Sequence, residues 1–109
     1  MITRDLLVKI DVRVGAIESV EGVKGSNKLV KLTVGLGDHR RTSLAGMRTE
    51  RVNPKEIAGR QSLFVVNVEP RKKMGEISQG MLFDIGYSDG LTPVMAVAEK
   101  ATPNGARAG

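Results

Sequence analysis

The sequence predicts an all-β fold in which short strands surround a single helical turn. Apolar residues at Ile10, Val12, Val14 and Ala16 alternate with polar or small ones, which is the period of a strand with one buried face. Further apolar segments follow at short intervals, separated by glycine, proline and polar residues. At 109 residues the chain has the length of one domain with a modest core, so we expect one domain over residues 1–109.

The first half of the chain contains two more predicted strands. Residues 29–36 are rich in β-branched side chains and predict one strand, and residues 41–45 predict a shorter one. The polar, glycine-rich link at 22–27 predicts a loop before them, and Gly37 with Asp38 predicts the turn between them.

A single helical turn is predicted at residues 53–59. Asn53 is placed to cap its start and Pro54 suits the first helical position. Glu56 lies in the first turn, and Gly59 ends the segment.

Three apolar segments in the second half, at 62–68, 81–85 and 92–97, predict further strands. Short strands with one helical turn between the third and the fourth are typical of a five-stranded OB-type barrel, partly open and Greek-key in topology. We therefore expect such a barrel with a short helix and terminal extensions.

The terminal segments 1–8 and 91–109 are not needed to build the barrel. Residues 92–98 are apolar enough to require a partner surface. We therefore expect the two terminal segments to form the interface of a homodimer.

The positive charge is concentrated in one third of the chain. Residues 40–73 hold nine of the 17 Lys and Arg residues and three of the 12 acids, a local net charge of +6. The remainder has a net charge of −1. Such asymmetry is typical of a protein that binds a polyanion, either nucleic acid or an anionic membrane surface. The nine cations are Arg40, Arg41, Arg48, Arg51, Lys55, Arg60, Arg71, Lys72 and Lys73.

The segment 66–81 carries the strongest local signal. An apolar strand runs into Pro70, which has no N–H and so ends the ladder. Arg71, Lys72 and Lys73 follow at once, which predicts three cations displayed in a loop at a strand end, where loops often carry recognition. A hairpin connection kept soluble by its charge is the alternative.

The sequence argues against an enzyme. It has no cysteine, and His39 is its only histidine, so there is no Cys/His metal site and no Ser/His/Asp arrangement. We expect no catalytic residue, metal or cofactor. No apolar run reaches the roughly 18–20 residues that cross a bilayer, and no export signal is visible, so we expect a cytoplasmic protein without a membrane partner.

Several motifs in a fixed order resemble those of one known family. The motifs are Asp11-Val12-Arg13-Val14-Gly15, Ser26-Asn27-Lys28-Leu29, Ala45-Gly46-Met47, Asn67 with Pro70-Arg71-Lys72, Ser78 with Gly80-Met81, and Pro103-Asn104-Gly105. The resemblance spans roughly residues 8–105 and points to the tRNA-binding OB-fold domain. This domain is found at the C-terminus of many methionyl-tRNA synthetases, in endothelial-monocyte-activating-polypeptide-like proteins, and in small stand-alone tRNA-binding proteins. Lys73 is a third cation where one or two are usual.

The resemblance implies a homodimer that recognises the overall fold of tRNA with little sequence preference. The composition agrees, because the chain has only three aromatic residues. Phe64 and Phe83 lie in apolar segments and are expected in the core, whereas Tyr87 lies in a turn and could be exposed. Because so few aromatic side chains are available to stack on bases, we expect binding through phosphates.

The candidate RNA-binding residues differ in weight. Arg71, Lys72 and Lys73 come first; Asn67 and Ser78 either meet the RNA or fix the local backbone. Arg40, Arg41 and Arg48 are expected on a solvated rim that adds steering. Arg13 either makes a weak contact with RNA or forms an ion pair with Asp11 or Glu18 on the surface of the sheet. The full set is Asn67, Arg71, Lys72, Lys73, Ser78, Arg40, Arg41, Arg48 and Lys28.

Two other functions stay open. Export-related chaperones that bind unfolded precursor proteins are a sister branch of this fold, and residues 102–107 resemble them closely, whereas residues 70–75 resemble the tRNA-binding branch more. A methionyl-tRNA synthetase beta-type subunit acting in trans would share the RNA chemistry and add a synthetase as partner.

Overall fold

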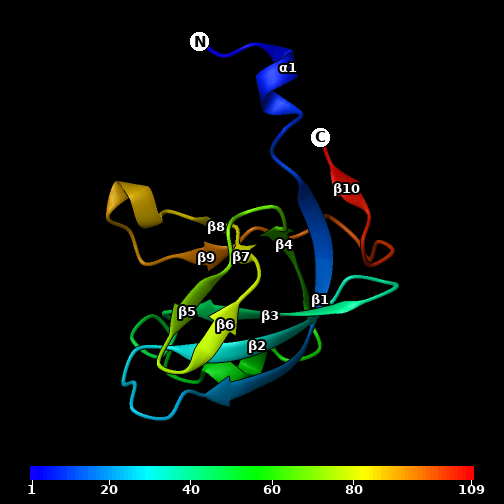
Figure 1. The fold of residues 1–109 in the computed structure, drawn as a ribbon. Coiled ribbons are helices and arrows are strands. Elements are labelled where there is room, and N and C mark those ends of the chain that lie inside the picture. Colours follow the sequence, from blue (N-terminus) through cyan, green and yellow to red (C-terminus); the bar gives the residue numbers. More distant parts are fainter.

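The computed structural model describes all residues 1–109 and is built around one long, bent strand (Figure 1). That strand, β1, lies at the centre of a sheet with the order β3-β2-β1-β4-β7, and β10 also pairs with β1. All pairings in this sheet are antiparallel. Its strands are β1 (Val12–Gly22), β2 (Val30–Gly35), β3 (Arg40–Ala45), β4 (Gln61–Val65), β7 (Met81–Leu82) and β10 (Arg107–Ala108).

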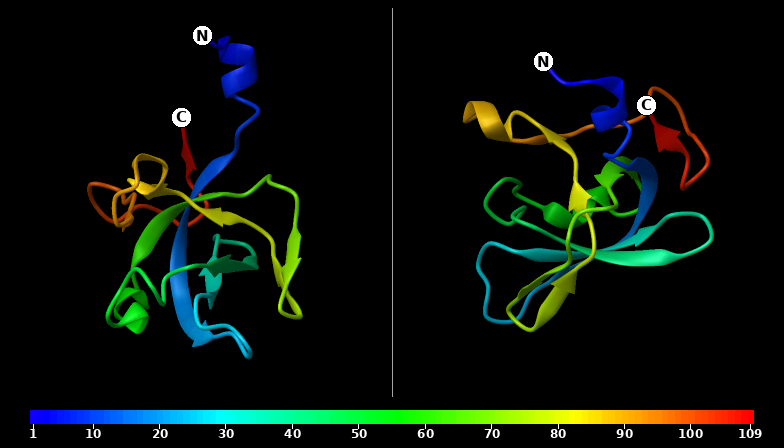
Figure 2. Two further views of the ribbon diagram at one scale, coloured as in Figure 1. Left: turned by 90° about the vertical axis from the view of Figure 1, so that its left-hand side faces the viewer. Right: turned by 45° about the horizontal axis from the view of Figure 1, so that its top comes forward.

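The other elements are short. Two small ribbons stand beside the main sheet, β5 with β6 and β8 with β9. Both chain ends lie at the same end of the molecule, where α1 projects from the barrel (Figures 1 and 2). The bounds are α1 (Arg4–Leu7), η1 (Pro54–Ile57), β5 (Arg71–Lys73), β6 (Glu76–Ser78), β8 (Asp84–Ile85), η2 (Tyr87–Asp89) and β9 (Val94–Met95).

The sheet curls because β1 serves two partners in succession. Its first half pairs with β4 and its second half with β2, and the register with β2 shifts between Ile17 and Ser19. Such an irregularity bends a strand and increases its twist. Phe64 and Ile17 then meet in the interior, so the expected core position of Phe64 is confirmed. The core also contains Val20, Val30, Leu32, Val34, Leu36, Met47, Ile57, Leu82 and Met95.

The free edge of β3 is covered by the segment after β6. The Gln79 N–H donates to the Thr42 carbonyl at 2.7 Å, and the Ser43 hydroxyl donates to the Gly80 carbonyl at 3.1 Å. These contacts bring the two ends of the sheet together without a regular ladder. The predicted all-β, OB-like barrel with a short helix is therefore confirmed.

Several predicted boundaries were wrong. β1 continues to Gly22 because β2 pairs with it along its second half, so the loop begins one residue later than predicted. The predicted strand at 92–97 shrinks to Val94–Met95, and that at 81–85 divides into β7 and β8. The helical turn is a 3-10 helix, and the Asn53 side chain makes no capping hydrogen bond.

The close packing at Gly15 yields a stability prediction. A Cβ at this position would lie 2.5 Å from Val34 Cγ1 and 2.9 Å from Phe64 Cδ1, both in the core. Gly15→Ala should therefore lower the free energy of unfolding by about 1–3 kcal/mol, as overpacking does. In the control Gly22→Ala, on the same strand, the new Cβ would meet only Arg48 Nη1 at 3.9 Å. Denaturant titration should show the loss in the first variant alone; equal midpoints would contradict this packing.

Candidate nucleic-acid interface

The three adjacent cations lie in a strand, not in a loop as predicted. They form β5, which pairs with β6 through the register Arg71↔Ser78, Lys72↔Ile77 and Lys73↔Glu76. Met74 and Gly75 connect the strands, both with positive φ (53° and 80°). A two-residue connection with positive φ at both positions matches the twist of a hairpin. Pro70 precedes this ribbon, so the chain after Val65 leaves the barrel and starts a new pair of strands.

The hairpin divides the cations between its two faces. Successive side chains of a strand point in opposite directions, so Arg71 and Lys73 share one face and Lys72 lies on the other. Arg71 and Lys73 line a hollow with Ser78, whereas Lys72 is paired with exposed Ile77 on the outer face. All three cations are exposed, and none forms an ion pair.

Ser78 holds the hairpin to the barrel. Its Oγ accepts the N–H of Leu44 on β3 at 3.0 Å and donates to the Gly80 carbonyl at 3.0 Å. The Gln79 side chain adds a bond by accepting the Thr42 N–H at 3.2 Å. The hydroxyl of Ser78 is thus engaged within the protein, in the structural role that was one of its two expected roles.

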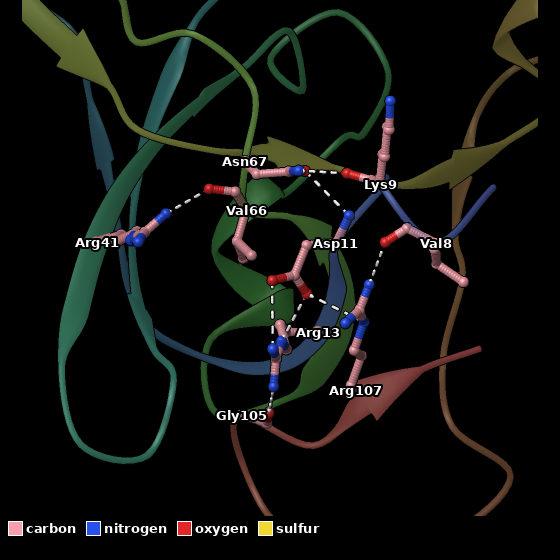
Figure 3. A network of polar contacts seen from close by, with 9 residues as sticks. All are labelled: Val8, Lys9, Asp11, Arg13, Arg41, Val66, Asn67, Gly105 and Arg107. Carbon is pink, nitrogen blue, oxygen red and sulfur yellow. Dashed lines mark hydrogen bonds and ion pairs between the residues drawn. The ribbon is translucent and has the colours of Figure 1, made fainter. Parts of the chain in front are cut away.

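Asn67 performs the same task at the other end of the segment (Figure 3). Its Oδ1 accepts the Asp11 N–H at 3.0 Å, and its amide nitrogen donates to the Lys9 carbonyl. The amide therefore ties the chain after β4 to the residues that precede β1. Asn67 fixes backbone rather than presenting a free amide.

Asp11 is the hub of this polar network (Figure 3). Its carboxylate accepts from Arg13 Nε at 2.6 Å and from Arg13 Nη2 at 3.2 Å, and it pairs with Arg107 at 3.6 Å. Arg107 donates to the Val8 carbonyl at 2.6 Å, and Arg13 donates to the Gly105 carbonyl at 3.2 Å. The hydrogen bond from Arg13 holds the pKa of Asp11 below its usual value. Both ends of the chain are thereby fastened to the start of β1.

The predicted rim cations are mostly engaged. Arg40 pairs with Glu18 at 2.6 Å, Arg48 donates to the Ser26 carbonyl at 2.7 Å, and Arg41 donates to the Val66 carbonyl. Their guanidinium groups are therefore partly occupied within the protein. Lys28 is exposed and makes no side-chain hydrogen bond or ion pair.

A cavity of about 730 Å³ lies between the hairpin and the barrel. Phe83 and Tyr87 both line it, and they are 45% and 69% exposed. The expected core position of Phe83 was therefore wrong: it falls between the short strands β7 and β8, where regular alternation breaks down. Lys28 and Lys73 line the cavity as well, so it opens beside the cations of the hairpin.

The fold and the basic hairpin agree with a comparison against known families. The model described as "Putative tRNA binding domain" matches residues 12–107. The chain belongs to this tRNA-binding domain family. The match covers the whole β5–β6 hairpin and all of the main sheet except Ala108, the last residue of β10.

Solved structures place the tRNA-binding domain among related proteins. The MetRS-related protein from Pyrococcus horikoshii is 33% identical with a TM-score of 0.90, covering 99% of this chain and 97% of that one. The CsaA chaperone protein from Picrophilus torridus is 26% identical with a TM-score of 0.85 and full coverage of both chains. The chaperone CsaA from Bacillus anthracis, at 24% identity and a TM-score of 0.85, covers 100% of this chain and 99% of that one and shares the fold.

Sequence reasoning named Lys28 and Lys73 but missed most of the other residues that line this cavity. Glu50 and Asp84 stand among them, and burial raises the pKa of both carboxyl groups. Nothing in the local sequence separates these acids from those on the solvated surface, because they come together only through the fold.

No helix of the structure has the length and apolar character needed to cross a membrane.

The hub at Asp11 yields a pH prediction. The pKa of Asp11 is lowered in the folded state, so its ionised carboxylate stabilises the fold. This stabilisation is fully present above the pKa of the unfolded chain, about 3.9, and is lost as the pH falls through the pKa of the folded state. Asp11→Asn should lower the melting temperature by a few degrees at pH 7, since the pairs are partly solvated. The gap between variant and parent should narrow below about pH 4. Thermal melts across pH 2.5–7 test this, and a gap that stays constant down to the lowest pH would contradict it.

Proposed function

We propose that this domain binds tRNA by its overall fold, through phosphates, with little preference for sequence. The observation that carries the proposal is the β5–β6 hairpin, which presents Arg71, Lys72 and Lys73 without an ion pair. Glu76 lies opposite Lys73 on β6, but it pairs with Lys31 at 3.6 Å. Membership of the tRNA-binding domain family supports tRNA as the polyanion. The activity is binding rather than catalysis.

The hairpin suits phosphate binding because its charges are free and its backbone is held. Arg71 and Lys73 are two residues apart on one face, a separation of about 6–7 Å, so they can contact neighbouring phosphates. The anchors at Asn67 and Ser78 limit the motion that binding would otherwise have to restrict. Arg40, Arg41, Arg48 and the other cations up to Lys55 form a flank that raises the encounter rate.

We also propose that the domain acts as a homodimer, with its terminal segments at the interface. α1 buries none of its residues against the barrel, and Leu6, Leu7 and Val8 are exposed by about half. Ile85 and Val94 face each other across β8 and β9 and are equally exposed. Figure 1 shows α1 at the end of the molecule where both termini lie, and the β8–β9 ribbon beside the barrel. Two copies joined there would carry two basic hairpins.

A chaperone that binds unfolded proteins is the second candidate. The same exposed apolar residues favour it, and so does the similarity to the CsaA chaperone protein, at 26% identity over the full chain. Cooperation with an aminoacyl-tRNA synthetase in trans is a further proposal, supported by the similarity to the MetRS-related protein. A competition titration of tRNA against an unfolded protein separates tRNA binding from chaperone activity.

Salt dependence tests the tRNA proposal. Each neutralised phosphate releases counterions, so tRNA affinity should fall steeply with salt. Arg71→Ala or Lys73→Ala should weaken all tRNAs about equally and lower the slope of log K against log salt by roughly one unit. Arg48→Ala should do less, because that side chain is bound to Ser26. Lys100→Ala, which removes an exposed lysine outside the charged third of the chain, is the matched control and should leave the slope unchanged.

Two results would overturn the tRNA proposal. One is binding that does not respond to salt. The other is a triple alanine variant at 71–73 that binds tRNA as well as the parent does. Either would move the chaperone candidate ahead.

Light scattering tests the dimer. The parent should be dimeric at micromolar concentration, and Leu7→Glu should shift it toward monomer, because a charge on α1 opposes burial of that surface. Val52→Glu is the control, since Val52 is fully exposed but lies outside the terminal segments. A monomeric parent, or equal dissociation in both variants, would contradict the proposed interface.

A further inference from the structure

The cavity beside the hairpin differs from the phosphate-binding face in its chemistry. Its volume is about 730 Å³, which is within the range of pockets for small organic groups. Fifteen residues line it, eight of them hydrophobic, and the polar remainder includes two acids and two lysines. We propose that this cavity binds one unpaired guanine nucleotide of the RNA held by the hairpin, an inference that rests on the proposed function.

The walls offer faces for a planar base. Phe83 and Tyr87 are both exposed into the cavity, and the thioethers of Met74 and Met81 complete its apolar surface. Bases stack on aromatic side chains with little regard to their identity. Met74 is placed there by the hairpin turn, the one non-glycine position with positive φ.

The acids supply the selectivity. Neither the Glu50 nor the Asp84 carboxylate accepts a side-chain hydrogen bond or forms an ion pair. Both groups are partly buried, and burial is the main cause of the raised pKa of each, with Asp84 adding to that of Glu50. A partly desolvated carboxylate without a donor is held at a cost in free energy. A ligand that brings N–H groups would remove that cost.

Guanine is the base whose donors match one carboxylate. Its N1–H and N2–H₂ groups are adjacent on the Watson–Crick edge and can meet the two oxygens of a single carboxylate together. Cytosine and adenine each offer one exocyclic amino group there, and uracil offers one ring N–H. Unpaired bases of RNA are read on these edges while stacked on side chains.

The lysines at the cavity decide between a nucleotide and a basic peptide. A lysine or arginine side chain would also satisfy Glu50 and Asp84, but it would meet Lys28 and Lys73 in the same cavity. A nucleotide fits both signs, because its base brings donors to the acids and its phosphate brings negative charge to the lysines. Arg71 lies on the same face of the hairpin as Lys73, so the RNA backbone can continue from one site to the other.

The cavity is separate from the surface proposed for dimerisation. Asp84 and Ile85 are neighbours on β8, and they point to opposite sides of that strand. Asp84 pairs with buried Met95 and lines the cavity, whereas Ile85 pairs with exposed Val94. Both sites can therefore be occupied at once.

Fold selectivity and a base pocket are compatible. The tRNA fold places its unpaired loop nucleotides at similar positions in different molecules, so one guanine contact adds affinity without separating tRNAs that share that guanine. Discrimination appears only when the base itself is changed.

The test compares hexanucleotides that differ in one base. UUUGUU, UUUAUU, UUUCUU and UUUUUU offer the same phosphates, and binding of each is followed by amide chemical shifts of the full chain. UUUGUU should bind roughly 5- to 150-fold more tightly than the others, the discrimination that one well-matched base contact provides. Its largest shifts should fall at Phe83, Asp84 and Tyr87. Free GMP should perturb the same amides with lower affinity, because it lacks the neighbouring phosphates.

The variants Glu50→Gln and Asp84→Asn test the acids one at a time. At least one should abolish the preference for UUUGUU while the salt slope for tRNA stays as in the parent. Asp89→Asn is the matched control, because Asp89 is exposed on η2 and does not line the cavity. Amide spectra report whether each variant is folded. Phe83→Leu, which leaves the acids intact, should weaken all four hexanucleotides.

Each outcome decides the matter. Equal affinity for the four hexanucleotides, or a preference that survives in both acid variants, overturns the guanine site, while salt-dependent tRNA binding would leave the proposed function standing. A preference for free GMP in a protein that does not bind tRNA would overturn both the proposed function and the RNA source of the nucleotide. Loss of the preference in an acid variant, with tRNA binding retained, supports the site.

Discussion

The way the free edge of β3 is covered determines the rest of the binding face. β2 pairs with one side of β3, and the other side would present unpaired backbone groups. Four hydrogen bonds cover that side instead of a ladder: they use the Gln79 N–H, the Gly80 carbonyl and the side chains of Ser78 and Gln79. A two-stranded ribbon is marginal by itself, so the β5–β6 hairpin depends on this attachment for its orientation. The cations of β5 are consequently carried by the barrel rather than by a free loop.

A second anchor acts on the other end of the same segment. Asn67 joins the chain leaving β4 to the residues before β1, and Asp11 joins those residues to the C-terminal strand through Arg107. The hairpin is therefore held where it begins and where it ends. The anchors use short polar side chains bonded to backbone, whose geometry does not depend on the length of the charged side chains that β5 displays. The charged side chains of β5 can therefore vary without disturbing the attachment of the hairpin to the barrel.

The sequence predicted the features that depend on local periodicity. Alternation located β1, because one buried face imposes a period of two. Enrichment in β-branched residues located β2, and a short apolar run located β4. The Met74-Gly75 connection was missed, since methionine is not a usual residue at positive φ. Phe83 was placed in the core because neighbouring apolar residues on two very short strands carry no period from which their direction can be inferred. The roles of Asn67 and Ser78 stayed open for a related reason: their partners are 56 and 34 residues away along the chain.

The arrangement separates the forces that attract a polyanion from those that can select among its parts. Exposed cations act over about the Debye length of 8 Å in physiological salt, so those of β5 influence the approach of a ligand before contact. Glu50 and Asp84 lie within the cavity, and Lys28 and Lys73 line the same space, so their negative charge is offset at a distance. These acids act only on a group that has entered. An anionic backbone that carries donor-rich bases satisfies both conditions, whereas a uniformly acidic or uniformly basic chain satisfies one of them.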